Sequence, residues 1–470
     1  MTHRPTALRG AAALMAVAFG LSACAAGGGD TKATSSNGGE GGIPKPSVSC
    51  EVPEGNIDDK PIDTSKVEGE ITFMTQGLQN DFKEFFEGQI KRFEQANPGT
   101  KIKWTDQGGS EDFDNLMATQ AQGCKMADVI NVPSGTILAL SKANLLMDLD
   151  VKAPGAGDHI VKSIWDSTGV GFQGHHTAIP WYFGPFITTY NKDVFERAGL
   201  DTDKSPATME ERFQFADKIA DANNGDYGIY GNANWYLPAE LHAMGVKMMN
   251  EDNTEFTFAS DPKAKTWLEE MAKLFKKGAI PPDSLTGDPD PGKTYNNGNL
   301  AFGTPNASFL RSVKENNPQV YEKTGVGSYP RAEGVKPLFN GQFLAISVTT
   351  KNAPLAMKFA QFVGSDDEAL AWTRDGGAII FPTATKALDQ LIAEPPKGAD
   401  DAVFSAAYEV AAAEAKDTEA FLPLFYVTGQ VQKALVDNFN AAVRGDVEPQ
   451  AALDKAQSEM NTLLSALLDD

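Results

Sequence analysis

The sequence predicts an α/β protein of two lobes, each a mostly parallel sheet flanked by helices. From Val67 onward, short β-branched or aromatic runs alternate with segments whose apolar residues recur at helical spacing, as in repeated βα units. The length of 470 residues suits two domains, each with a sizeable core. Residues 178–200 form an aromatic run broken by Pro180, Gly184 and Pro185, which is typical of a strand that kinks as it leaves one sheet for another.

The start of the chain predicts a signal peptide over residues 1–23. Arg4 and Arg9 precede a short apolar segment that ends in Leu21-Ser22-Ala23-Cys24. A membrane span would need about 20 apolar residues, so a cleaved segment is favoured over a transmembrane helix. The ending resembles a bacterial lipobox, which would make Cys24 the diacylated first residue of the mature protein; the alternative is an ordinary cleavage site. Residues 24–65 would then be a flexible linker between lipid and body.

Charge and cysteine content restrict the partners. The net charge of −22 makes nucleic acid an improbable partner and favours solubility outside the cell. If Cys24 carries lipid, Cys50 and Cys124 remain as one pair in an oxidising compartment, where disulfides persist. The alternative is two free thiols, with Cys124 buried as a small apolar residue.

Three βα units are expected in the first part of the body. The expected strands are 71–74, 101–104 and 128–130, and the expected helices are 82–93, 112–122 and 137–143. In such sheets, ligands bind outside the carboxyl ends of the strands. The loops after the strands contain the polar candidates Gln76, Gln79, Asp81, Ser110, Glu111 and Ser134. For any one of them, an ordinary surface loop is the alternative.

The second part begins with a helix after the crossing, which Asn191 or Asp193 can cap and Gly199 can end. A glycine turn is expected to enter a short strand within 295–303, where glycine permits close approach of the backbone to a ligand; a plain turn is the alternative. A return strand is expected at 341–347. The further expected helices are 209–222, 244–249, 263–276, 352–363, 430–443 and 451–468.

The crossing also carries a family resemblance. Its pattern, Ile-Pro-Trp-Tyr over 179–182 and Tyr-Asn-Lys-Asp-Val-Phe-Glu-Arg-Ala-Gly-Leu-Asp over 190–201, resembles the hinge of the extracellular solute-binding proteins of ABC importers, the maltose-binding-like group. The resemblance covers nearly all of 67–468. It implies a periplasmic-binding-protein-like fold of the class II type with a ligand cleft between lobes. The implied lobes are 66–183 plus 345–405 and 184–344 plus 406–470.

The sequence contains no enzyme motif that its surrounding residues support. Residues 287–294 match the sequence pattern of a phosphate-binding loop. However, Pro289 and Pro291 have no backbone N–H group that could donate a hydrogen bond to a phosphate. The adjacent His175 and His176 would face opposite ways on a strand, and no zinc-binding spacing accompanies them. We find no nucleophile elbow and no assignable pair of catalytic carboxylates. No catalytic residue, metal or cofactor is therefore expected.

A sugar-binding cleft fits the remaining residues. Sugars present apolar C–H faces and rings of hydroxyls, so their sites combine flat aromatic side chains with amides, carboxylates and arginine. The candidates in the crossing and the facing segments are Trp181, Tyr182, Trp235, Tyr236, Asn306, Gln342, Trp372, Arg374, Tyr426 and Gln430. Core packing is the alternative for each tryptophan. Gly184 stands about where maltose-binding protein has a sugar-contacting acid, so the resemblance does not identify the sugar.

The resemblance implies a monomeric receptor, anchored by lipid on the extracellular or periplasmic side of the membrane. It would capture a sugar or oligosaccharide and deliver it to the transmembrane permease subunits of an ABC transporter. Two alternatives remain: a receptor for glycerol phosphate or another polar solute, and a secreted carbohydrate-active hydrolase. A phosphate ligand would require converging arginines or helix N-termini, and the candidate loops contain few basic residues.

Overall fold

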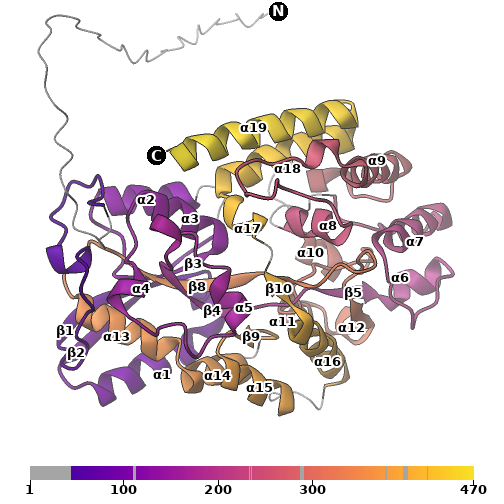
Figure 1. The fold of residues 1–470 in the computed structure, drawn as a ribbon. Coiled ribbons are helices and arrows are strands. Elements are labelled where there is room, and N and C mark those ends of the chain that lie inside the picture. The colour runs from indigo at the N-terminus through magenta and orange to yellow at the C-terminus, as the bar shows by residue number, and fades with distance from the viewer. Residues whose placement is uncertain are drawn as a thin grey trace, which may run out of the picture. The chain divides into compact units, whose positions relative to one another are not determined.

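A six-stranded sheet organises the first lobe of the computed structural model (Figure 1). Its strand order is β2-β1-β3-β8-β4-β9. The strands are β1 (Gly69–Gln76), β2 (Thr100–Gln107), β3 (Val129–Pro133), β4 (Ala178–Phe183), β8 (Gly341–Ile346) and β9 (Phe381–Pro382). The structure describes residues 44–109, 113–231, 233, 236–285, 290–375, 378–394, 401–420 and 422–469. The expected signal peptide and Cys24 lie outside these ranges.

Helices cover this sheet because their apolar residues recur on one face. In α1 (Gln79–Ala96), Phe86, Ile90 and Phe93 are spaced by three or four residues and are buried against the sheet. The ring of Phe93 packs against the ring of Phe359, which lies after the return strand, with 5.1 Å between the two ring centroids. The other helices of this lobe are α2 (Phe113–Gln122), α3 (Ser134–Lys142), α4 (Leu149–Lys152), α5 (Lys162–Asp166), α13 (Ala353–Val363), α14 (Asp366–Asp375) and α15 (Thr385–Ala393).

The second lobe is mainly helical, around the antiparallel pair β5 (Ile187–Asn191) and β6 (Thr324–Ser328). Its helices are α6 (Lys192–Arg197), α7 (Met209–Ala222), α8 (Leu237–Ala243), α9 (Pro262–Lys277), α10 (Pro291–Asn296), α11 (Phe309–Asn316), α12 (Pro318–Glu322), α16 (Ala402–Asp417), α17 (Pro423–Tyr426), α18 (Gly429–Arg444) and α19 (Pro449–Asp469). Figure 1 shows α9, α18 and α19 together, where the buried side chains of Trp267, Phe439 and Met460 form part of a second core. Two short strands, β7 (Leu338–Phe339) and β10 (Glu419–Ala420), pair with each other.

The crossing from β4 to β5 has the expected local chemistry. Asn191 caps α6, since its side-chain oxygen accepts hydrogen bonds from the backbone N–H groups of Asp193 (3.0 Å) and Val194 (3.3 Å). Gly199 follows with φ +66°, the left-handed conformation that glycine adopts without steric cost. Both the helix after the crossing and its cap are therefore confirmed.

Two expectations about secondary structure are corrected. Within the six-stranded sheet β1 pairs in parallel with β2 and β3, whereas β8 runs antiparallel to β3 and β4; β5 and β6 of the second lobe are an antiparallel pair. The first lobe is therefore a mixed sheet, because its fourth strand in order returns from far along the chain. Residues 244–249 contain no helix: Gly245 has φ +76°, and Met249 forms an isolated bridge with Phe256. The left-handed conformation of Gly245 prevents a helix here, although the spacing of the apolar residues is helical.

Residues 44–66 pack against the first lobe. Asn56, in a short 3₁₀ helix (η1, Glu54–Asn56), donates hydrogen bonds to the carbonyls of Val348 and Thr350, both at 2.8 Å. The buried ammonium of Lys152 pairs with Asp58. The expected flexible linker over residues 24–65 is therefore corrected for residues 44–65, while residues 24–43 lie outside the described ranges.

The sulfurs of Cys50 and Cys124 form a disulfide in the structure, with their Cα atoms 5.9 Å apart. This bond joins the packed segment before β1 to the end of α2. Within the ranges given above, we find no helix whose length and hydropathy would let it cross a bilayer.

Candidate functional site

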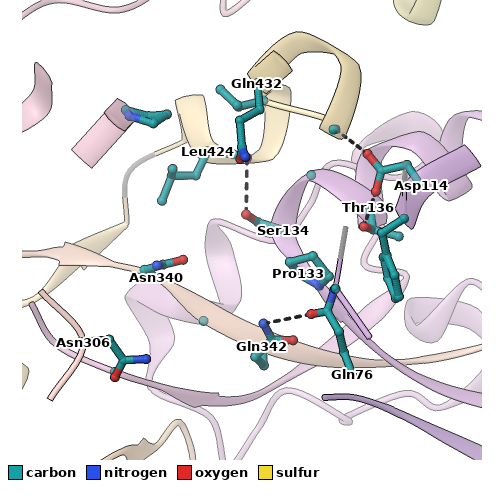
Figure 2. Close-up of a pocket in the computed structure, with 18 of the residues that line it drawn as sticks. Gln76, Asp114, Pro133, Ser134, Thr136, Asn306, Asn340, Gln342, Leu424 and Gln432 are labelled. Atoms are coloured by element: carbon teal, nitrogen blue, oxygen red, sulfur yellow. Dashed lines mark hydrogen bonds between the residues drawn. The ribbon is translucent and has the colours of Figure 1, made fainter. Parts of the chain in front are cut away.

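A cavity of about 540 Å³ opens at the carboxyl ends of β1 and β3, within the usual size range of ligand pockets (Figure 2). Both lobes contribute to its walls. Its polar lining is mostly amide and hydroxyl: Gln76, Asp114, Ser134, Thr136, Tyr182, Asn306, Asn340, Gln342 and Gln432. The apolar lining includes Phe113, Phe186, Pro238, Ile380, Leu424 and Val427.

The first-lobe wall is a network of amides fixed by the sheet register. Asn131 on β3 is fully buried; its side-chain oxygen accepts from the Gln76 backbone N–H at 3.1 Å, and its amide donates to the Gln342 side chain at 2.9 Å. The Gln342 amide lies 3.4 Å from the Gln76 side-chain oxygen, as Figure 2 shows. These contacts hold Gln76 and Gln342 in one orientation, so a ligand would meet pre-oriented amides.

Asn306 and Asn340 line another part of the cavity (Figure 2). The Asn306 oxygen accepts from the Ser308 backbone N–H at 2.9 Å, which leaves its amide N–H groups for other partners. The Asn340 side chain makes no hydrogen bond to any residue that the structure describes. Gly184 lies beside Asn306, and a Cβ there would stand 3.8 Å from the Asn306 oxygen. The missing side chain at Gly184 therefore leaves space in the cavity.

A carboxylate lies at the N-termini of two helices on a further wall. Asp114, near the start of α2, accepts a hydrogen bond from the backbone N–H of Gly429, the first residue of α18, at 2.6 Å. Its other oxygen accepts from the Thr136 hydroxyl in the first turn of α3. The two lobes meet closely here, because a Cβ on Gly135 would lie 2.4 Å from the Val427 carbonyl oxygen. Ser134 donates across the same contact to the Leu424 carbonyl at 3.2 Å.

Of the described aromatic candidates, Tyr182 lines the cavity, whereas Trp181, Trp372 and Tyr236 are core residues. Tyr182 is half-buried and lines the cavity, and burial, with a smaller contribution from the Asp106 carboxylate, raises the pKa of its phenol. Trp181 and Trp372 are each only 1% exposed, so the expectation that they contact ligand is corrected. Their rings support Tyr182 from behind, at centroid distances of 5.0 and 5.7 Å.

The remaining candidates are placed as follows. Gln76, Ser134, Tyr182, Asn306 and Gln342 line the cavity, whereas Gln79, Asp81, Tyr236, Arg374, Tyr426 and Gln430 are not part of its lining. Asp81 pairs with Arg311, Arg374 lies 3.4 Å from Glu394, Tyr236 is buried in the second core, Tyr426 is half-buried and Gln430 is exposed. Ser110, Glu111 and Trp235 lie outside the described residues.

Four polar lining residues were not predicted from the sequence: Asp114, Thr136, Asn340 and Gln432. Asp114 falls within the expected helix 112–122, whereas ligand contacts were expected in the loops that follow the strands. Its position in the first turn, directly after a candidate loop, is the signal that could have found it. Asn340 precedes the return strand by one residue, where the same rule of strand ends would have applied had the strand direction been known.

The side chains that line the cavity carry little charge. None of its described lining residues is lysine, arginine or histidine, and Asp114 is the one acid among them. Each oxygen of the Asp114 carboxylate already accepts one hydrogen bond, from Gly429 and from Thr136, so the charge of this acid is partly compensated within the protein. The cavity can thus recognise a neutral solute with many hydroxyls through amides, hydroxyls and one aromatic ring.

A histidine-carboxylate cluster lies apart from the cavity lining. His175 Nδ1 is 2.5 Å from Asp148, and His176 Nδ1 is 3.0 Å from Asp150. Asp148 also accepts from the backbone N–H of Asp150 at 3.0 Å and so caps α4. Each of these side chains has a hydrogen-bond partner within the cluster. Packing of the loop against α4 therefore explains their arrangement.

Comparison with known proteins gives a family match. The model of the family described as bacterial extracellular solute-binding protein matches residues 77–370. The sn-glycerol-3-phosphate-binding periplasmic protein UgpB of Salmonella typhimurium is 24% identical over 413 residues, which are 80% of this chain and 88% of that protein. The diacetylchitobiose binding protein DasA of Streptomyces coelicolor is 22% identical over 248 residues, which are 51% of this chain and 56% of its own length.

A similar solved structure is an ABC transporter solute binding protein of Thermotoga lettingae, bound with alpha-D-tagatose. Its TM-score is 0.69 at 21% identity, and the match covers 84% of this chain and 100% of that chain. The likeness shows a shared two-lobed fold. These relatives are binding proteins rather than enzymes.

Proposed function

The chain belongs to the bacterial extracellular solute-binding proteins, and from this premise we propose that it is a lipid-anchored receptor for a neutral sugar or oligosaccharide. One observation carries the choice of ligand: a cavity with walls of amides and hydroxyls and with no cationic side chain among its described lining. Side-chain amides donate and accept hydrogen bonds, as sugar hydroxyls do, so each matches the other without a charged partner. Tyr182 offers an aromatic edge or face to the C–H groups of a sugar ring.

A second candidate ligand is a glycerol phosphate, which the similarity to UgpB over 80% of the chain favours. Phosphate sites in proteins commonly use arginine or lysine, because a charged donor gives a stronger hydrogen bond to phosphate oxygens. The absence of such a side chain from the described lining makes the neutral solute the better match.

Delivery and anchoring complete the proposal. Family membership supports a location outside the cytoplasmic membrane and import through an ABC transporter. We further propose that Cys24 carries the lipid, that the receptor acts as a monomer, and that permease subunits receive the ligand from it. The proposed lobes are 66–183 plus 345–405 and 184–344 plus 406–470, with the cavity between them.

A ligand screen tests the proposed function. The purified chain would be melted with and without mono- and disaccharides, polyols and sn-glycerol 3-phosphate, and each hit would be measured by calorimetry. A ligand at 100 times its Kd, bound only by the folded state, adds about 2.7 kcal/mol to the free energy of unfolding. We expect a neutral sugar to raise the melting temperature most. A response to sn-glycerol 3-phosphate alone would refute the neutral-solute proposal.

A further inference from the structure

The Asp114 carboxylate connects the two lobes at the cavity wall. Asp114 belongs to α2, and its partner Gly429 begins α18, which is 315 residues away along the chain. The N-cap residue of α18, Thr428, makes no side-chain hydrogen bond to the helix, and Pro133 makes none to α3. Asp114 therefore supplies from another element the acceptor for the first backbone N–H of α18, and it also accepts from the Thr136 side-chain hydroxyl in the first turn of α3 (Figure 2).

A helix N-terminus carries unpaired backbone N–H groups and a partial positive charge, and both favour an anion. Two helix starts, in α3 and α18, converge on this wall, and the described lining holds no cationic side chain. The start of α18 is thus a place in the cavity where a soluble anion could obtain charge-compensating contacts. The protein's own carboxylate already occupies it.

We propose that Asp114 is the residue that determines the charge selectivity of the cavity. By holding its carboxylate against the N-terminus of α18, it denies that position to anionic solutes and repels a second negative charge nearby. Neutral solutes are unaffected by this repulsion and bind to the amides of the other walls. The inference rests on the proposed function, a receptor for neutral solutes, and names the feature that excludes anions.

Two variants separate charge from volume. Asp114→Asn keeps the size of the side chain and removes its charge, while Asp114→Ala also vacates the space in front of the Gly429 N–H. Asp437→Asn is the matched control, because it removes one negative charge from the exposed side of the same helix α18. Circular dichroism and melting temperature would verify that all three variants fold.

Calorimetry at low ionic strength would measure the binding of inorganic phosphate and of sn-glycerol 3-phosphate to the full chain and its variants. We expect the affinity for both anions to rise at least tenfold in Asp114→Ala, by a smaller factor in Asp114→Asn, and to stay unchanged in Asp437→Asn. Anion affinities that equal the unmodified chain in both Asp114 variants would overturn the inference. An equal rise in Asp437→Asn would also overturn it, since net charge alone would then explain the gain.

The inference and the proposed function fail in different ways. If the unmodified chain binds no neutral sugar, the proposed function fails, whatever the variants do with anions. If the unmodified chain binds a sugar and neither Asp114 variant gains affinity for phosphate, the proposed function stands and the role of Asp114 is refuted.

Discussion

Replacing Trp181 by alanine should destabilise the fold and should weaken ligand binding by less than about tenfold, because the buried indole can act on the ligand only through Tyr182. The indole is 1% exposed, lies 5.9 Å from the Phe86 ring and 6.1 Å from the Trp372 ring, and its N–H has no partner among the described residues. Its loss therefore removes packing and no hydrogen bond. Truncation of a buried tryptophan costs about 3–5 kcal/mol, which corresponds to a fall of roughly 6–20 °C in melting temperature at 2–4 °C per kcal/mol.

Asn340→Ala is the matched comparison and should have the opposite effect: it should weaken ligand binding and leave the stability of the fold almost unchanged. Its side chain lines the cavity and has no hydrogen-bond partner among the described residues, so the fold should lose less than about 0.5 kcal/mol. One lost hydrogen bond to a neutral ligand is worth about 0.5–1.5 kcal/mol, or a 2- to 12-fold weaker Kd.

Both variants would be measured by differential scanning calorimetry without ligand, and by titration with the sugar found in the screen, well below each melting temperature. The reasoning is refuted if Trp181→Ala melts within about 3 °C of the unmodified chain and yet binds the sugar more than tenfold more weakly. That outcome would mean that Trp181 contacts the ligand, contrary to its burial.

Three further predictions concern the segment before β1. Lys152→Met should lower the free energy of unfolding by about 1–3 kcal/mol, measured by denaturant titration, because it leaves the partly buried Asp58 carboxylate and two backbone carbonyls without their donor. The hydrogen bond from Lys152 is the main cause that lowers the pKa of Asp58 below its ordinary 3.8, with a smaller contribution from the Lys60 backbone N–H. The associated stability is present above about pH 4 and is lost as the pH falls through the depressed value. This acid dependence should shrink in Lys152→Met, and an unchanged acid dependence would contradict the assignment. Reduction of the bond between Cys50 and Cys124, which are 74 residues apart, should cost about 4–5 kcal/mol by the chain-entropy model, and mass spectrometry of an unreduced digest should find the linked peptides rather than two alkylated ones. Cys24→Ala should release a folded body from the membrane fraction, and retention after a high-salt wash would exclude lipid anchoring through that residue.

The order and type of most elements followed from the sequence, because periodicity and caps act over neighbouring residues. The spacing of Phe86, Ile90 and Phe93 predicted α1, and Asn191 with Gly199 predicted the bounds of α6. The rule of strand ends also brought Gln76 and Ser134 correctly to the cavity.

The face that each residue presents was decided by tertiary structure. Trp181 and Tyr182 are neighbours on β4, where a register shift between Pro180 and Tyr182 interrupts the regular alternation of faces, and their rings lie 5.0 Å apart; Trp181 is buried in the core, whereas Tyr182 lines the cavity. The sequence alone could not choose between them, because the aromatic run does not specify where that register shift falls. Only the packing of α1 and α14, through Phe86 and Trp372, shows that Trp181 takes the core side.

Contacts between distant segments were likewise beyond the sequence. Asp114 reaches Gly429 across 315 residues, and Gln342 reaches Gln76 across 266. No local pattern specifies which helix start a given carboxylate will meet, since that depends on how the second lobe packs against the first. The amino-acid sequence therefore determined the secondary-structure elements, the family and a set of polar candidate residues. The packing of the two lobes determined which of these residues share a cavity and what charge that cavity carries.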